Sequence, residues 1–183
     1  MLELNFSPFP VLKTERLLLR SLEISDAPEM LFLRSDETVM QYIDRERTKT
    51  LEDAEIFIQK LKDSIDTNEN ILWVISLPDH PNTMIGTIGF WRIQLPHYRA
   101  EIGYVLHPGY WNKGIMKEAI EAVNKYGFEN MKLHSIEARI NPENIASGKV
   151  LEKTDYIREA YFKEDYYYNG RFIDTAVYSL LAK

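Results

Sequence analysis

The sequence predicts a single mixed α/β (α+β) domain, and three observations support this fold class. Helix and strand patterns alternate along the whole chain, and the middle holds three consecutive β-rich runs. No repeat, linker or low-complexity stretch divides the sequence. A length of 183 residues with 45% hydrophobic residues is ordinary for one globular unit. We therefore expect residues 1–183 to form one domain.

Two helices are expected in the first third of the chain, after a short strand over residues 16–20. Ser25-Asp26-Ala27-Pro28-Glu29 combines an N-cap residue with an early proline and glutamate, which predicts a helix through Leu33. A second helix follows Thr50 and Asp53, because apolar residues then recur at helical spacing. These apolar residues are Leu51, Ala54, Phe57, Ile58, Leu61 and Ile65.

Antiparallel strands are predicted in the middle of the chain, over residues 71–77, 84–93 and 101–106. A helix is predicted over residues 112–128, because apolar residues return to helical spacing there. The face that this helix would bury holds Ile115, Ala119, Ala122, Val123 and Tyr126.

The last third predicts a strand over residues 135–140 and a helix from Asn141-Pro142 to about Lys153. Two further strands, over residues 156–162 and 172–180, flank Asn169-Gly170, and Asn-Gly is a strong hairpin signal. The expected order of elements is therefore β-α-α-β-β-β-α-β-α-β-β.

The composition excludes several classes of protein. With 22 Lys+Arg against 28 Asp+Glu the net charge is −6, which argues against direct nucleic-acid binding and suits a neutral or cationic small partner. Without cysteine there is no thiolate metal site and no cysteine nucleophile, and the histidines show no metal-ligand spacing. No apolar run approaches the ~18 residues of a membrane helix, and no signal peptide is recognisable. We expect a cytoplasmic protein that binds neither a metal nor a membrane.

The chemically informative segment runs from a strand that ends at Leu106 into the helix that follows. A helix N-terminus presents unpaired N–H groups and a positive dipole end, which together bind phosphate. Gly114 would let the backbone approach an anion closely, and Lys113 adds a positive charge. The alternative is a plain strand-to-helix turn in which the glycine only relieves strain, and spacing alone leaves both open.

At this point an ordered set of motifs resembles the GNAT N-acetyltransferases. Within that family the set is similar to the RimJ/RimL-like branch, which acetylates N-terminal amines of ribosomal proteins. The resemblance covers the chain from about Thr14 to Leu180. Its motifs are Arg16-Leu17-Leu18-Leu19-Arg20, Asp26-Ala27, Ala100-Glu101-Ile102-Gly103-Tyr104, Tyr110-Trp111-Asn112-Lys113-Gly114 with Glu118-Ala119, Asn141 to Ser147, Val150 to Lys153, Asp174, and Tyr178-Ser179-Leu180.

The resemblance implies a GNAT fold, with a mixed, mostly antiparallel twisted sheet flanked by about four helices. It also implies that acetyl-CoA donates an acetyl group directly to a primary amine in a ternary complex, without a metal. The strand backbone at Tyr104, Val105 and Leu106 would pair with the pantetheine amides, and the Val105 N–H would polarise the thioester. Asn144 would contact the cofactor from the following helix. The pyrophosphate would lie on the loop of Trp111, Asn112, Lys113, Gly114, Ile115 and Met116.

Two side chains match the family's catalytic positions. Glu101 would remove a proton from the acceptor ammonium, and its alternative role is a solvated strand charge or a salt bridge to Arg99. Ser147 would protonate or hydrogen-bond the departing CoA thiolate, and its alternative is a bond to its own helix backbone. The sequence departs from the family pattern at Asn112 and Met116, which puts its affinity for CoA in question.

Several functions remain open at the level of the sequence. The acceptor could be a protein N-terminal amine, a polyamine, an amino acid or an aminoglycoside. A second reading is a module that senses acetyl-CoA without turnover. RNA or ribosome binding as the main role would need a basic stripe that the sequence lacks. Relatives often pair through their terminal strands, which makes a homodimer an open alternative.

Overall fold

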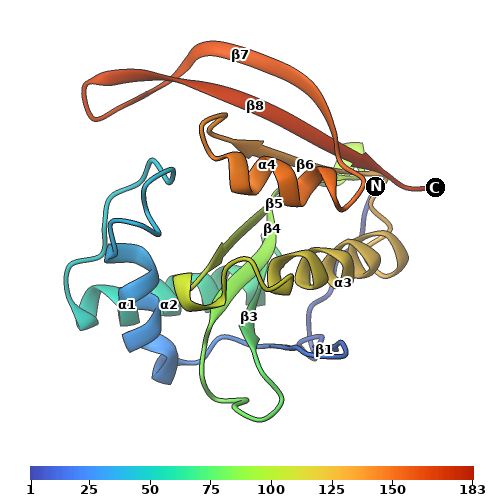
Figure 1. Ribbon diagram of the computed structural model, residues 1–183. Helices are drawn as coiled ribbons and strands as arrows, with labels where there is room; N and C mark the ends of the chain where they lie inside the picture. The colour runs from blue at the N-terminus through green and yellow to red at the C-terminus, as the bar shows by residue number, and fades with distance from the viewer.

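The computed structural model describes residues 1–183 and is built around one eight-stranded sheet, in the order β1-β2-β3-β4-β5-β6-β8-β7 (Figure 1). All neighbouring strands are antiparallel except β5 and β6, which are parallel. The strands are β1 (Leu12–Lys13), β2 (Leu18–Arg20), β3 (Ile71–Ser76), β4 (Gly86–Gln94), β5 (Arg99–Leu106), β6 (Ser135–Ile140), β7 (Ile157–Tyr168) and β8 (Arg171–Leu181). The helices are α1 (Ala27–Ser35), α2 (Leu51–Asp66), α3 (Ile115–Glu129) and α4 (Ile145–Glu152).

The predicted fold class is confirmed, because the sheet is mixed and mostly antiparallel and carries four α-helices. The two-residue strand β1, which the sequence did not predict, pairs with β2 at the sheet edge. None of the helices combines the length and the hydrophobicity that a membrane span requires.

Several predicted boundaries were wrong. Helix α3 begins at Ile115 and not at 112, because Asn112 and Gly114 adopt φ values of 58° and 75°, outside the helical region. Helix α4 begins at Ile145 rather than at Asn141-Pro142. Strand β7 continues to Tyr168, beyond the predicted end at residue 162, because a bulge interrupts its alternation there.

The helices cover the two faces of the sheet differently. Helix α3 crosses in front of β3 and β4 in Figure 1, whereas α2 runs behind them with α1 packed against it. Trp73 of β3 makes edge-to-face contact with Tyr126 of α3, with ring centroids 5.3 Å apart. A Cβ on Gly127 would lie 2.9 Å from the Phe90 ring, so only glycine lets α3 approach this closely. This packing fixes the position of α3 and of its N-terminus relative to β3 and β4.

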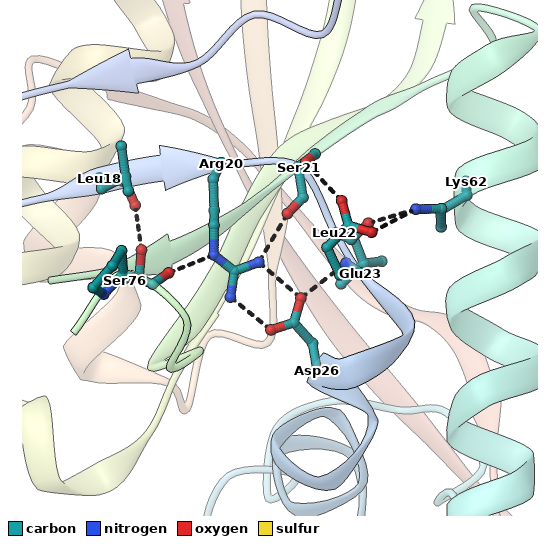
Figure 2. Close-up of polar contacts among 9 residues, drawn as sticks. Leu18, Arg20, Ser21, Leu22, Glu23, Asp26, Lys62 and Ser76 are labelled. Carbon is teal, nitrogen blue, oxygen red and sulfur yellow. Dashed lines mark hydrogen bonds and ion pairs between the residues drawn. The ribbon is translucent and has the colours of Figure 1, made fainter. Parts of the chain in front are cut away.

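A bidentate ion pair fastens the start of α1 to strand β2, as Figure 2 shows. Arg20 donates to the two carboxylate oxygens of Asp26 at 2.6 and 2.8 Å, and also to the carbonyl of Pro81 at 2.7 Å. Asp26 is 1% exposed and also accepts the backbone N–H of Glu23. Each polar group of this buried cluster therefore has a partner, which burial of charges requires.

Figure 2 also contains a second ion pair that is much more exposed, between Glu23 and Lys62. We expect Asp26→Asn to lower the free energy of unfolding by about 3 kcal/mol, because Arg20 loses its buried partner. Glu23→Gln is the matched control and should cost less than about 1 kcal/mol, since water screens that pair. Urea unfolding followed by circular dichroism measures both, and equal losses would contradict this assignment.

Candidate active site

A gap opens between strands β5 and β6 in the centre of the sheet. Strand β5 pairs with β4 from Arg99 to Leu106, but its ladder with β6 covers only residues 99–101. Beyond Glu101 the edge of β5 that faces β6 has no strand neighbour. Helices α3 and α4 both begin on the side of the molecule where this gap lies (Figure 1). An extended ligand can therefore add to the free edge of β5 and meet the N-terminus of a helix.

The two faces of β5 carry different candidate groups, because successive side chains of a strand point in opposite directions. Tyr104 lies opposite Ile88 of β4, on the face covered by α3 and α4. Glu101 lies opposite Trp91, on the other face. The predicted acid and the predicted base therefore approach the gap from opposite sides of the sheet.

On the α4 side, the hydroxyls of Ser147 and Tyr104 are hydrogen-bonded at 2.7 Å. The alternative reading of Ser147, a hydroxyl bonded to its own helix backbone, is wrong. Burial raises the pKa of Tyr104 well above its usual value, so its phenol stays protonated and can donate. The side-chain oxygen of Asn144 accepts the backbone N–H of Ser147 at 3.1 Å and caps α4. Its expected contact with the cofactor stays a prediction.

On the other face, Glu101 is an inward-facing carboxylate whose side chain is 18% exposed. The pKa of Glu101 is raised, mainly because the carboxylate is buried and also because the carboxylate of Glu137 lies nearby. The positive charges of Arg92 and Arg139 lower this pKa but do not outweigh burial. The alternative role of Glu101, a salt bridge to Arg99, is wrong. Arg99 pairs with Glu137 on β6, and Glu101 pairs with Arg92 at 2.9 Å.

The segment from Trp111 to Met116 forms the predicted loop at the start of α3. The first helical bond runs from the N–H of Glu118 to the carbonyl of Gly114, so the N–H groups of the three preceding residues have no helical acceptor. The indole N–H of Trp111 donates to the carbonyl of Leu106 at 2.7 Å, which ties the loop to the end of β5. The ammonium of Lys113 donates to the carbonyl of Gly109 at 2.7 Å.

A polar cluster that the sequence did not predict supports this loop from behind, and we call it the Glu118 cluster (Thr14, Arg16 and Glu118). The carboxylate of Glu118 accepts the Thr14 hydroxyl at 2.5 Å, the Arg16 backbone N–H at 2.9 Å and the Arg16 Nε at 2.6 Å. Burial raises the pKa of Glu118, but these hydrogen bonds outweigh it and hold the pKa below its usual value.

The Glu118 cluster also orients one peptide unit of the loop. Arg16 Nη1 donates to the carbonyl of Lys113 at 2.9 Å. Because the C=O and N–H of a trans peptide point in opposite directions, the N–H of Gly114 then points away from Arg16. The first turn of α3 therefore keeps its donors facing outward from the cluster, where an anion can reach them.

The sequence did not show the side-chain roles of Arg16, Arg92 and Tyr104. Arg16 lies 102 residues from Glu118, and nothing local indicates that they meet. Tyr104 was predicted to act through its backbone only. The pairing of Arg92 with Glu101 depends on a strand irregularity without a sequence signal. Only the contact between Tyr104 and Ser147 had a signal in the sequence, because Tyr104 lies on the face of its strand that the helix of Ser147 covers.

Replacing Glu118 tests the support of the loop. A carboxylate whose folded pKa is lowered adds stability above its unfolded pKa and loses it as the pH falls through the folded pKa. We therefore expect Glu118→Gln to reduce stability by about 1–3 kcal/mol at neutral pH. The difference from the wild type should shrink as the pH is lowered below 4.5, the usual pKa of glutamate. Urea midpoints over this pH range provide the measurement, and a constant difference would count against the cluster.

Comparison with known proteins gives a consistent result. Residues 16–157 match the family model described as "Acetyltransferase (GNAT) domain". The uncharacterized N-acetyltransferase YoaA of Bacillus subtilis is 35% identical over 173 residues, covering 94% of this chain and 97% of its own.

Solved structures agree. A GNAT-family acetyltransferase from Bacillus anthracis matches with a TM-score of 0.83 and 37% identity, covering 94% of this chain and 98% of its own. RimL, the ribosomal L7/L12 alpha-N-protein acetyltransferase, solved in complex with coenzyme A, matches with a TM-score of 0.85 over 94% of this chain and 98% of its own; at 21% identity it supports the fold alone. The chain therefore belongs to the GNAT family of acetyltransferases and is an acetyl-CoA-dependent N-acetyltransferase.

Proposed function

We propose that this enzyme acetylates a primary amine by direct attack on bound acetyl-CoA, with Glu101 as the base and Ser147 as the hydroxyl that serves the leaving thiolate. One observation carries the proposal. The carboxylate and the hydroxyl pair lie on opposite faces of β5, at the strand edge where β6 diverges. An acceptor and a donor that enter from opposite sides would meet there.

The cofactor would lie along the free edge of β5, with its pantetheine amides on the backbone of Tyr104, Val105 and Leu106. Its pyrophosphate would lie on the loop from Trp111 to Met116, where the first turn of α3 has N–H groups without helical acceptors. Strand addition to a free edge and anion binding at a helix N-terminus both use backbone groups. The departures Asn112 and Met116 are therefore compatible with binding, because these contacts do not depend on the side chain.

The proposed reaction starts from an acceptor ammonium. Glu101 accepts one proton, directly or through a water molecule, and the free amine attacks the thioester carbonyl. The resulting oxyanion would be stabilised by the backbone N–H of Val105. Collapse of the tetrahedral intermediate breaks the carbon–sulfur bond and forms the amide, and the second proton of the amine nitrogen passes to water. The CoA thiolate takes a proton from the Ser147 hydroxyl, which Tyr104 orients across their 2.7 Å hydrogen bond, and a proton from solvent then restores the hydroxyl.

We propose a peptide N-terminal amine as the acceptor. The long connection between α1 and α2 meets the tip of the β7–β8 hairpin, where Tyr166 donates to the carbonyl of Asp44 at 3.3 Å. A pocket at this junction is lined by Asp44, Arg45, Tyr168 and Arg171 among others. Such a surface offers hydrogen-bond donors and acceptors to an extended chain.

A CoA thiol-release assay with a panel of amines identifies the acceptor. The panel contains N-terminal peptides, polyamines, amino acids and aminoglycosides. Turnover with polyamines only would refute the peptide proposal.

Replacing Glu101 is the direct test of the base. We expect Glu101→Gln to lower kcat by about 10²–10⁴-fold, the usual contribution of a positioned base. Since the pKa of Glu101 is raised, the wild-type rate should fall as the pH decreases through a midpoint above 4.5. This fall, the acidic limb of the pH–rate profile, should be absent in the variant. Glu121→Gln, an exposed carboxylate on α3, is the matched control and should leave the rate unchanged. Wild-type rates in the Glu101 variant would exclude this base.

The same assay distinguishes the contributions of the Ser147 and Tyr104 hydroxyls to the rate. We expect Ser147→Ala to lower kcat about 100-fold, since the leaving thiolate loses its proton donor. Tyr104→Phe should cost about tenfold, because Ser147 keeps its hydroxyl but loses its orienting partner. The KM for acetyl-CoA should change little in both variants. A larger loss for Tyr104→Phe would instead assign the proton transfer to the phenol.

A further inference from the structure

Strand β4 contains a bulge directly opposite the proposed base. Trp91 pairs with Glu101 and Gln94 pairs with Arg99, so β4 uses one more residue than β5 over this stretch. Arg92 lies in the bulge with φ of 45°, a left-handed conformation that is uncommon for a residue with a side chain. Bulges re-aim side chains and occur next to active sites.

The bulge changes the face on which Arg92 appears. In a regular strand the residue after Trp91 would point to the α3 face, away from Glu101. The structure instead places Arg92 Nη1 2.9 Å from the Glu101 carboxylate. The two partners are unequal in exposure, at 69% for Arg92 and 18% for Glu101. The cation therefore reaches in from solvent, and it returns to water when another cation takes its place at the carboxylate.

The other charged groups around Glu101 already have partners. Glu137, opposite Glu101 on β6, pairs with Arg99. Arg139, also on β6, pairs with Asp165 of β7 at 3.1 Å. On the remaining side the indole of Trp91 lies over Gly103, since a Cβ there would be 2.6 Å from the indole nitrogen. Arg92 is thus the one exposed cation that directly satisfies Glu101.

We propose that Arg92 is a positioning residue that occupies the Glu101 carboxylate when no acceptor is bound, and that the acceptor's ammonium group replaces it there. The inference rests on the proposed role of Glu101 as the base. It names the substrate class by chemistry, because only an amine that arrives protonated can replace a guanidinium. It also explains the strained bulge, which brings an exchangeable cation to the face of the sheet that carries Glu101.

Removing the guanidinium should have two linked effects. The acceptor no longer competes with Arg92, so we expect Arg92→Gln to lower the KM for a cationic amine about fivefold, as for an ion pair of this exposure. Arg92 also favours the charged form of Glu101, so its loss raises the pKa of Glu101 further. The acidic limb of the kcat/KM profile should therefore move to higher pH. The KM for acetyl-CoA should not change.

The experiment compares the wild type, Arg92→Gln and Arg92→Lys, with Lys125→Gln as a charge-matched control on the exposed face of α3. Steady-state kinetics would be measured across pH with the best amine of the acceptor panel. Arg92→Lys keeps the charge, so we expect it to restore much of the wild-type KM and limb. An unchanged or higher amine KM in Arg92→Gln, or an unmoved acidic limb, would overturn the proposal.

A double variant separates failure of this inference from failure of the proposed function. If Glu101→Gln keeps wild-type activity, the base assignment fails, and with it the role of Arg92. If Glu101→Gln is impaired but Arg92→Gln is kinetically silent, only the role of Arg92 fails. When both are correct, adding Arg92→Gln to Glu101→Gln should no longer lower the amine KM, because a neutral amide does not hold the guanidinium.

Discussion

The divergence of β5 from β6 after Glu101 is the constraint on which the rest of the active site depends. These are the only parallel neighbours in the sheet, and α3 makes the crossover between them. A parallel pair that separates leaves backbone donors and acceptors unused in the middle of the protein. The helix packing through Trp73, Phe90 and Gly127 then sets where the start of α3 lies relative to that free edge. In the proposed binding mode, the position of the cofactor thus follows from backbone geometry before any catalytic side chain is considered.

The site keeps its acidic and neutral polar groups apart. The α4 face of β5 holds two uncharged hydroxyls, and burial keeps the phenol of Tyr104 neutral. The other face holds the carboxylates of Glu101 and Glu137, each paired with an arginine from a neighbouring strand. In the proposed mechanism, the proton taken from the amine on one face and the proton given to sulfur on the other need not be the same proton. The enzyme would then return to its starting state by exchange with water on each side.

Local signals in the sequence predicted the fold well, and long-range contacts account for most of what was missed. Thr50 and Asp53 form the expected capping box, and Asn169-Gly170 adopts the two positive φ values of a tight hairpin. The predicted start of α3 at residue 112 was wrong because the left-handed conformation of Asn112 has no clear sequence signal. The alternative salt bridge from Glu101 to Arg99 was also wrong, because parallel register and a bulge, not sequence proximity, decide which charges meet.

Trp111 gives this enzyme a built-in optical reporter. Its indole is 39% exposed and is hydrogen-bonded to the end of β5, whereas Trp73 is fully buried and Trp91 is half-buried. Fluorescence from the exposed indole is therefore the component most sensitive to quenchers in solvent and to changes at the start of α3. Binding of the proposed cofactor to this loop would then be measurable by fluorescence of the unlabelled protein, independently of turnover.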